Sequence, residues 1–366
     1  MKGLTDLQLI LIAGGSILIL FIIIYNRIRA NRLRKAEIAR RLAEEAAEKA
    51  ETAPENGPGK AVEPGEMVDT VMAQIEESEK AAVEESLVSG MREFPVDDII
   101  ECAITITPES EVPAEKILPL LQSWQYAGKM PVRFVGLTDD GNGQKNWHAI
   151  RPSHTYSQFR ACVLLANRHG ALTDIEFSSL IAQLNHLTAD IDAEMDVPDM
   201  EKVIDQAKQL HEFVSNHDAK IWLSIQPNGQ PWTREQVTAA LEKYQYQPRP
   251  DGTWVKNDPE EGAECELFLI GTFSKKDSDK VLSLILFLDV PCIPREKDPF
   301  HQMVSCAQVL CKELDGTLVD EKGNVLTDAY VTAIAGHLEQ YYQVMQSASL
   351  HAGSLRSLRL YRLQAV

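Results

Sequence analysis

The hydrophobic pattern is most distinctive in the segment Ser283–Asp289, where apolar side chains fill both alternating sets of positions. In a strand, residues two apart lie on the same side of the sheet. An antiparallel sheet normally has one apolar side and one solvated side. This strand therefore predicts a sheet that needs an apolar cover on both sides, one of which a partner molecule can supply. One side holds Ile285 and Phe287, and the other holds Leu284, Leu286 and Leu288.

The pattern around this strand predicts an antiparallel α+β domain over residues 218–346. Alternating apolar residues predict further strands, and apolar residues at helical spacing predict two long helices. A capping box, Thr233–Gln236, begins a shorter helix. The element order is β-α-β-β-β-α-β-β-α, with one face of the sheet backed by helices. The predicted strands are Ile221–Ile225, Glu266–Thr272 and a hairpin in Gly316–Leu326, and the helices follow Asp298 and Thr327.

Residues 97–217 repeat this arrangement in a weaker form. A strand over Ile99–Ile106 ends in Thr107–Pro108, and a capping box at Thr173–Glu176 begins the first of two long helices. Pro119 lies inside the first helical stretch, where it costs about 3 kcal/mol unless the helix breaks there, and this weakens the repeat. We interpret 97–217 and 218–346 as tandem domains of one type, the first degenerate. Residues 347–366 are basic and form either a tail or a short added helix.

The N-terminal part of the chain has the pattern of a membrane anchor. Leu7–Tyr25 has no charged residue, and 19 helical residues span about 28 Å, close to the hydrocarbon core of a bilayer. A cleaved signal peptide is the competing interpretation, but the apolar run is long and no small-x-small cleavage site precedes the charged flank. Lys2 lies before the span and seven cations follow it within residues 27–41, so residues 1–6 are predicted to be periplasmic and the remainder cytoplasmic.

The segment between the anchor and the domains is predicted to tether them. Residues 26–50 read as a basic, then charged, juxtamembrane helix, and residues 51–96 as an acidic linker broken by Pro and Gly. A weak apolar rhythm at Val68, Met72 and Ile75 is compatible with a transient helix. As a coil, the linker reaches roughly 35–40 Å.

Composition narrows the possible functions. A net charge of −18 and a pI near 5.0 argue against nucleic acid as the main partner. The six cysteines form no CxxC pair, and the sequence has no P-loop, HExxH or GxSxG motif. We therefore expect no cofactor, no metal site and no enzymatic activity.

The order of these motifs resembles the ZipA family, bitopic division proteins that connect the tubulin-like polymer FtsZ to the bacterial inner membrane. The resemblance rests on Ile285–Pro291, on Cys306–Leu310, on Asp315–Asp320 and on the helix after Thr327, and more loosely on Leu7–Gly15. It implies a division-site protein whose open sheet face takes the C-terminal peptide of FtsZ. The residues implied for this face are Trp222, Ser224, Leu267, Leu269, Gly271, Phe273, Ile285 and Phe287.

The chain departs from the family in its shorter acidic linker and in the extra segment 97–217. Other interpretations stay open at this point. The first domain or a second chain can pack on the apolar face, since exposed apolar patches are interfaces of some kind. A membrane-tethered scaffold for another protein and an enzyme without a recognisable motif are the alternative functions, and an RNA-binding sheet is disfavoured by the acidic charge.

Overall fold

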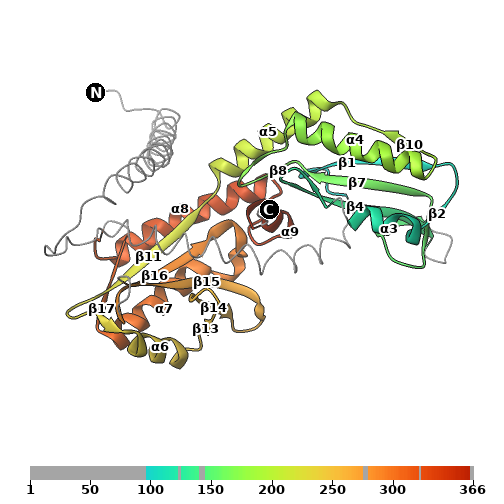
Figure 1. Cartoon of the computed structure of the whole chain (residues 1–366). Helices are drawn as coiled ribbons and strands as arrows, with labels where there is room; N and C mark the ends of the chain where they lie inside the picture. Colours follow the sequence, from blue (N-terminus) through green and yellow to red (C-terminus); the bar gives the residue numbers. More distant parts are fainter. Residues whose placement is uncertain (1–95, 123–124, 140–144, 275–278, 321–322, 363–366) are drawn as a thin grey trace, which may run out of the picture. The chain divides into compact units, whose positions relative to one another are not determined.

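The computed structural model of the protein describes residues 96–122, 125–139, 145–274, 279–320 and 323–362 (Figure 1). They belong to one compact unit of the chain, Val62–Val366. The predicted periplasmic end, transmembrane helix, juxtamembrane helix and linker, apart from Val96, lie outside the described residues. Among the described helices, none is long and apolar enough to cross a membrane.

The second predicted domain contains an antiparallel sheet with the order β13-β14-β15-β16-β11-β17, and β12 pairs with β16. The doubly apolar strand predicted from the sequence is β16, which lies between β15 and β11. The predicted strand is therefore confirmed, and it occupies an interior position in the sheet. The bounds are β11 Lys220–Pro227, β12 Trp232–Thr233, β13 Gln247–Pro248, β14 Trp254–Asp258, β15 Gly262–Ser274, β16 Lys280–Asp289 and β17 Gly316–Val319.

The first predicted domain contains a second antiparallel sheet with the order β10-β1-β7-β4-β3, and β5 pairs with β4. Two small pairings, β2-β6 and β8-β9, lie beside it. The bounds are β1 Glu101–Pro108, β2 Val112–Pro113, β3 Tyr126–Ala127, β4 Met130–Asp139, β5 Lys145–Ala149, β6 Thr155–Tyr156, β7 Gln158–Leu164, β8 Ala166–Asn167, β9 Gly170–Ala171 and β10 Ala193–Asp196.

The central strands of the two sheets follow the same order. The series β10-β1-β7-β4 corresponds to β17-β11-β16-β15. In the first series β1 lies between β10 and β7, and in the second β11 lies between β17 and β16. β1 and β11 are the first long strands of their segments. β10 and β17 are short and precede the last long helix, whereas β7 and β16 precede both long helices. The repeat seen in the hydrophobic pattern therefore has a counterpart in the strand topology.

Each sheet has three accompanying helices, and four of these six, α4, α6, α7 and α8, begin where the sequence signals predict. Thr173 and Thr233 form capping boxes with Glu176 and Gln236, which satisfy backbone N–H groups at the starts of α4 and α6. The helix does not break at Pro119, because α3 continues through it and keeps Ile117 and Leu121 buried. The bounds are α3 Ala114–Gln122, α4 Asp174–Asp190, α5 Met200–Asn216, α6 Arg234–Lys243, α7 Pro299–Leu314, α8 Asp328–Ser347 and α9 Leu355–Tyr361, with 3₁₀ turns at Val290–Cys292 and Arg295–Lys297.

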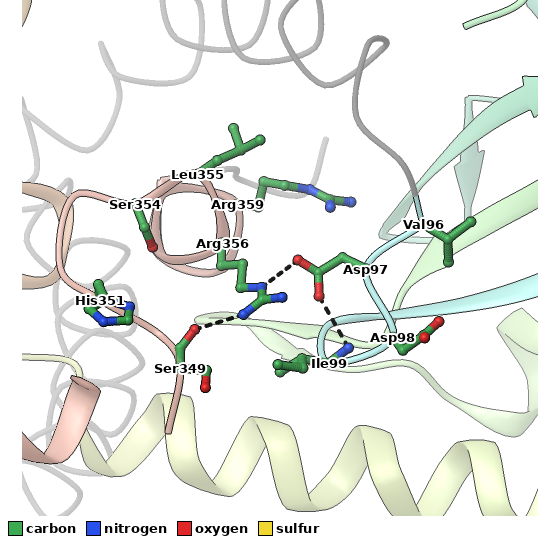
Figure 2. A pocket seen from close by; sticks show the side chains of 10 residues that line it. All are labelled: Val96, Asp97, Asp98, Ile99, Ser349, His351, Ser354, Leu355, Arg356 and Arg359. Atoms are coloured by element: carbon green, nitrogen blue, oxygen red, sulfur yellow. Dashed lines mark hydrogen bonds and ion pairs between the residues drawn. The ribbon is translucent and has the colours of Figure 1, made fainter. Parts of the chain in front are cut away.

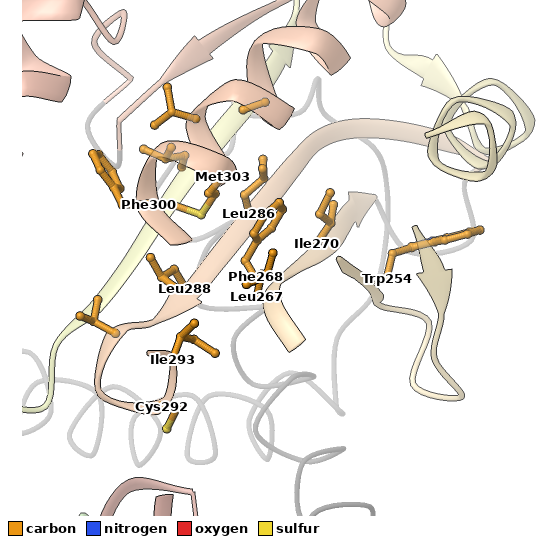
Figure 3. Close-up of a cluster of buried hydrophobic side chains, with 14 of the residues drawn as sticks. Trp254, Leu267, Phe268, Ile270, Leu286, Leu288, Cys292, Ile293, Phe300 and Met303 are labelled. Carbon is orange, nitrogen blue, oxygen red and sulfur yellow. The ribbon is translucent and has the colours of Figure 1, made fainter. Parts of the chain in front are cut away.

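The main core of the second domain lies between its sheet and α7. Leu286 and Leu288 of β16 pack in one cluster with Phe300 and Met303 of α7 (Figure 3). These residues are almost fully buried, as the helical stripe after Asp298 and the alternation in β16 predict. In the first domain, α4 contributes Phe177, Leu180 and Leu184 to a separate cluster.

The C-terminal helix α9 connects the two domains. Leu360 and Tyr361 are fully buried in the larger core cluster, which also takes in Ile100 and Leu164 from the first domain. Arg359 is bonded to the buried carboxylate of Glu101 in β1. Of the two forms considered for residues 347–366, a tail or a helix, the structure has a helix over 355–361.

Close to this contact, Arg356 donates from Nε to Asp97 at 2.5 Å and from Nη1 to the carbonyl of Ser349 at 3.1 Å (Figure 2). Ion pairs therefore accompany the apolar contact between α9 and the start of the first domain.

Candidate partner-binding face

The side of the second sheet that carries Phe287 is built from rows of cross-strand neighbours, and we call it the aromatic face. In one row, Trp222 of β11 lies opposite Phe287 of β16, Phe287 lies opposite Leu269 of β15, and Leu269 lies opposite Val255 of β14. Directly opposed residues in antiparallel strands have Cβ atoms about 4.5–5.5 Å apart, so this row forms a continuous apolar strip.

Two further rows extend the aromatic face along the strands. The second row runs from Val319 of β17 through Ser224 and Ile285 to Gly271. The third pairs Ser283 with Phe273. The structure thus brings seven of the eight predicted residues onto one face: Trp222, Ser224, Leu269, Gly271, Phe273, Ile285 and Phe287.

The eighth predicted residue, Leu267, is an error of the sequence analysis. Lys256 pairs with Phe268 and its neighbour Asn257 pairs with Glu266, so β15 has one extra residue at this point. Such a bulge ends the strict alternation of sides. Leu267 is fully buried in the main core cluster, together with Phe268 and Ile270.

Two apolar residues of the aromatic face were missed. Val255 lies in β14, a strand of five residues to which the predicted element order gave no residue range. Leu282 lies at a second register shift, between the pairs Phe273–Ser283 and Ser274–Val281, and packs against the same cluster. The alternation of Trp254, Val255 and Lys256 is too short to have identified the strand.

The apolar side chains of the aromatic face are closed to solvent in the single chain. Val255, Leu269, Phe273, Ile285 and Phe287 form a cluster separate from the main core, and each is between 0 and 8% exposed. Among the described residues, those that pack against this cluster as partly buried hydrophobics are Trp222 and Leu282, which belong to the same strands. The sheet therefore has apolar layers on both sides, as the pattern of β16 predicts.

A pair of hydroxyls forms the polar part of the aromatic face. The oxygens of Ser224 and Ser283 lie 2.6 Å apart, and Ser283 also donates to the carbonyl of Ile225 at 3.2 Å. Both residues are buried, and these bonds remove the cost of burying their hydroxyls.

Charged groups lie beyond the apolar rows of the face, within β15 and at the end of β16. Glu266 of β15 is paired with Arg249 at 2.7 Å. At the end of β16, Asp289 is paired with Arg168 of the first domain at 3.0 Å, and Arg168 also contacts Asp218 at 2.6 Å. Burial opposes the ionisation of Asp289, but the guanidinium of Arg168 outweighs it and lowers the pKa of the carboxyl. These pairs leave the middle of the face to apolar contacts.

The described residues offer little for catalysis or metal binding. Burial raises the pKa of the Cys102 thiol to about 11 and that of Cys162 to about 12, so both are protonated at neutral pH and are poor nucleophiles. Within the described ranges, no group of three or more His, Cys, Asp or Glu residues is placed to hold a metal ion.

The second domain is a mixed α+β domain whose antiparallel sheet carries helices on one side and the aromatic face on the other. Residues 221–336 match the family model of ZipA, C-terminal FtsZ-binding domain. The match runs from β11 into α8 and confirms the resemblance for this part of the chain. This part of the chain is therefore similar to the C-terminal FtsZ-binding domain of ZipA. No curated protein is a significant match to the chain.

Proposed function

We propose that the protein is a membrane-anchored cell division protein that binds the C-terminal peptide of FtsZ on the aromatic face and holds the Z-ring at the inner membrane. The observation that supports this most is the position of the face: the family match 221–336 includes both β11 and β16, which supply its centre. The predicted anchor Leu7–Tyr25, with its basic flank, supplies the membrane attachment in this proposal.

The anchors of the peptide would be Trp222, Phe273 and Phe287. Aromatic side chains bury a large area with few rotatable bonds, and truncating such an anchor commonly costs about 2 kcal/mol or more. This loss corresponds to roughly thirtyfold in affinity. Ser224, Leu269, Gly271 and Ile285 would line the surface between them, with Gly271 directly opposite Ile285.

Binding of the full chain to FtsZ, and to FtsZ without its C-terminal peptide, tests the proposal. We expect Phe287→Ala to weaken binding to intact FtsZ about thirtyfold. Val309→Ala is the matched control, because Val309 lies on α7 and is 39% exposed. Equal binding to FtsZ with and without its terminal peptide, or an unchanged affinity of Phe287→Ala, would show that the face serves another partner.

The membrane part of the proposal has its own test. A reporter fused after Val366 should be active when it requires the cytoplasm and inactive when it requires the periplasm. The reverse result would contradict the orientation that the cations after Tyr25 predict.

A further inference from the structure

The first domain contacts the second at the ends of the two strands that form the centre of the aromatic face. Arg168, the residue after β8, donates from Nη1 and Nη2 to the two carboxylate oxygens of Asp289, each at 3.0 Å. Asp289 is the last residue of β16. The Nη2 group also donates to Asp218 at 2.6 Å, and Asp218 lies two residues before β11. One side chain of the first domain therefore joins the ends of two neighbouring strands of the second sheet.

This junction is buried and includes the C-terminal helix α9. The side chains of Arg168, Asp289 and Asp218 are 7%, 11% and 24% exposed. The ring centre of Tyr361 in α9 lies 5.6 Å from the guanidinium carbon of Arg168, whose backbone N–H donates to the carbonyl of Leu360 at 2.8 Å. A planar guanidinium that forms a bidentate pair with a carboxylate holds it in one orientation. The first domain and α9 together therefore fix the position of Asp289 at the end of β16.

The junction lies close to one row of the aromatic face and far from another. Phe287, which lies opposite Trp222, is two residues from Asp289 along β16, a distance of about 7 Å in a strand. Phe273 lies opposite Ser283, which is six residues from Asp289, a distance of about 20 Å. A change at the junction should therefore affect the row of Trp222 and Phe287 much more than the row of Phe273.

We propose that Arg168 is a positioning residue for the aromatic face: it holds the ends of β11 and β16 together, so that Trp222 and Phe287 are already arranged for a partner peptide. The ends of strands open locally more easily than their centres. A surface that is ordered in advance loses less conformational entropy when a peptide binds. The first domain thus supports the binding surface of the second domain instead of forming another one. The identity of the peptide, the C-terminal peptide of FtsZ, rests on the proposed function, whereas the support of the strand ends does not.

Amide hydrogen exchange in the purified full chain, followed by mass spectrometry of overlapping peptides, tests the support without any partner. The variant Arg168→Lys keeps the positive charge but cannot form the bidentate pair. We expect exchange to become about tenfold faster in residues 218–223 and 286–290, at the ends of the strands next to the junction. Residues 224–227 and 280–284, at the opposite ends of the same strands, should exchange as in the wild type.

The matched control is Arg249→Lys, which changes another largely buried arginine that is paired with a strand of the same sheet. Arg249 lies 2.7 Å from Glu266, and its side chain is 14% exposed. This variant should leave exchange at the ends of β11 and β16 unchanged. The backbone N–H of Val290 still donates to the carbonyl of Ala219 in Arg168→Lys, so the strand ends should loosen without separating. Uniformly faster exchange along both strands would overturn the proposal, because it would show a loss of global stability.

The affinity of the full chain for a synthetic FtsZ C-terminal peptide gives the second readout. Arg168→Lys should lower this affinity about fivefold in the wild type and in Phe273→Ala, but about twofold or less in Trp222→Ala, because coupled residues are not additive. A fivefold loss in both backgrounds would overturn the proposal, since the effect would not pass through Trp222.

Two other outcomes separate the support from the proposed function. If the wild type binds the peptide and Arg168→Lys binds it equally well, Arg168 does not position the aromatic face and the proposal is wrong. If exchange at the strand ends rises as expected but the wild type does not bind the peptide, the support stands and the proposed function fails.

Discussion

The two sheets share their central strand order but differ on the side turned away from the helices. Strands β1 and β11 are each eight residues long and end in Pro, so their positions can be matched one to one. The row Trp222, Phe287, Leu269 of the second sheet corresponds to Ala103, Cys162, Arg133 of the first, and the row Ser224, Ile285, Gly271 corresponds to Thr105, Arg160, Val135.

This replacement turns an apolar surface into a polar one. Arg160 lies with its guanidinium carbon 4.2 Å from the ring centre of Trp147, and Arg133 is paired with Glu101 at 2.7 Å. Without counterparts of Trp222 and Phe287, a peptide on the first sheet loses most of the area that yields about 25 cal/mol per Å² on burial. The same topology can therefore carry different surfaces, and the partner is decided by a few side chains on one face.

The largest loss of stability is expected when a buried charge of the first sheet is removed. Glu101 is buried and accepts hydrogen bonds from Arg133 and from Arg359 of α9. Removing one partner of a buried ion pair leaves uncompensated charge and typically costs about 3–5 kcal/mol. We expect Glu101→Ala to lower the free energy of unfolding by this amount, measured by urea denaturation of the full chain.

The control is another glutamate in the same domain. Glu111 pairs with Lys145 at 3.7 Å, and the side chains of Lys145 and Glu111 are 50% and 59% exposed. Glu111→Ala should change stability by less than about 1 kcal/mol. If both substitutions have the same small effect, the contact between Glu101 and α9 does not hold the first domain in place.

The two sides of β16 should respond differently to truncation. Leu286 is fully buried against α7, so Leu286→Ala should cost about 2–5 kcal/mol through the lost contacts and the cavity left behind. Phe287→Ala removes a side chain from the second cluster and leaves the helix-backed core intact. Its midpoint of thermal unfolding should fall less, while its affinity for FtsZ falls more.

The result that would contradict this expectation is equal unfolding by both variants with no selective loss of FtsZ binding. In that case the aromatic face is part of the permanent core of the domain rather than a binding surface.

Low pH should reduce the folding stability of the first domain because it protonates Glu101. Burial disfavours the charged carboxylate, but Arg133 and Arg359 outweigh burial, so the pKa of Glu101 lies below its ordinary value of 4.5. A carboxyl whose pKa is lowered by folding contributes stability that is present above the unfolded pKa and is lost as the pH falls through the folded pKa. Between about pH 6 and pH 3, the thermal midpoint of the wild type should fall more steeply than that of Glu101→Gln. Parallel slopes would show that other carboxyls dominate the acid response.

The smallest effect is expected on the outer face of the first sheet. Arg160→Ala removes the contact with Trp147 at the position that corresponds to Ile285. Because this face lacks the aromatic anchors, FtsZ affinity should stay within about twofold of the wild type in a binding titration. A tenfold loss would mean that the first sheet also takes part in binding.

Much of the fold follows from local pattern in the sequence. The alternation in Ser283–Asp289 was enough to place Ile285 and Phe287 on one side and Leu286 on the other, because strand geometry has a period of two. Capping residues such as Thr173 and Thr233 marked helix starts, because their hydroxyls satisfy N–H groups within three residues. The apolar face of the candidate site was predictable for the same reason.

Only the tertiary structure decided which residues depart from that pattern and what joins the domains. Leu267 turns into the core because β14 and β15 pair with a shifted register, which depends on the partner strand and not on the local sequence. Glu101 and Arg359 are 258 residues apart, and charges at such separation show their pairing only once the chain has folded. The sequence by itself thus determined the two sides of each element, through periods of two and 3.6 residues. Long-range packing determined which side a residue at a bulge faces and which buried charges pair with each other.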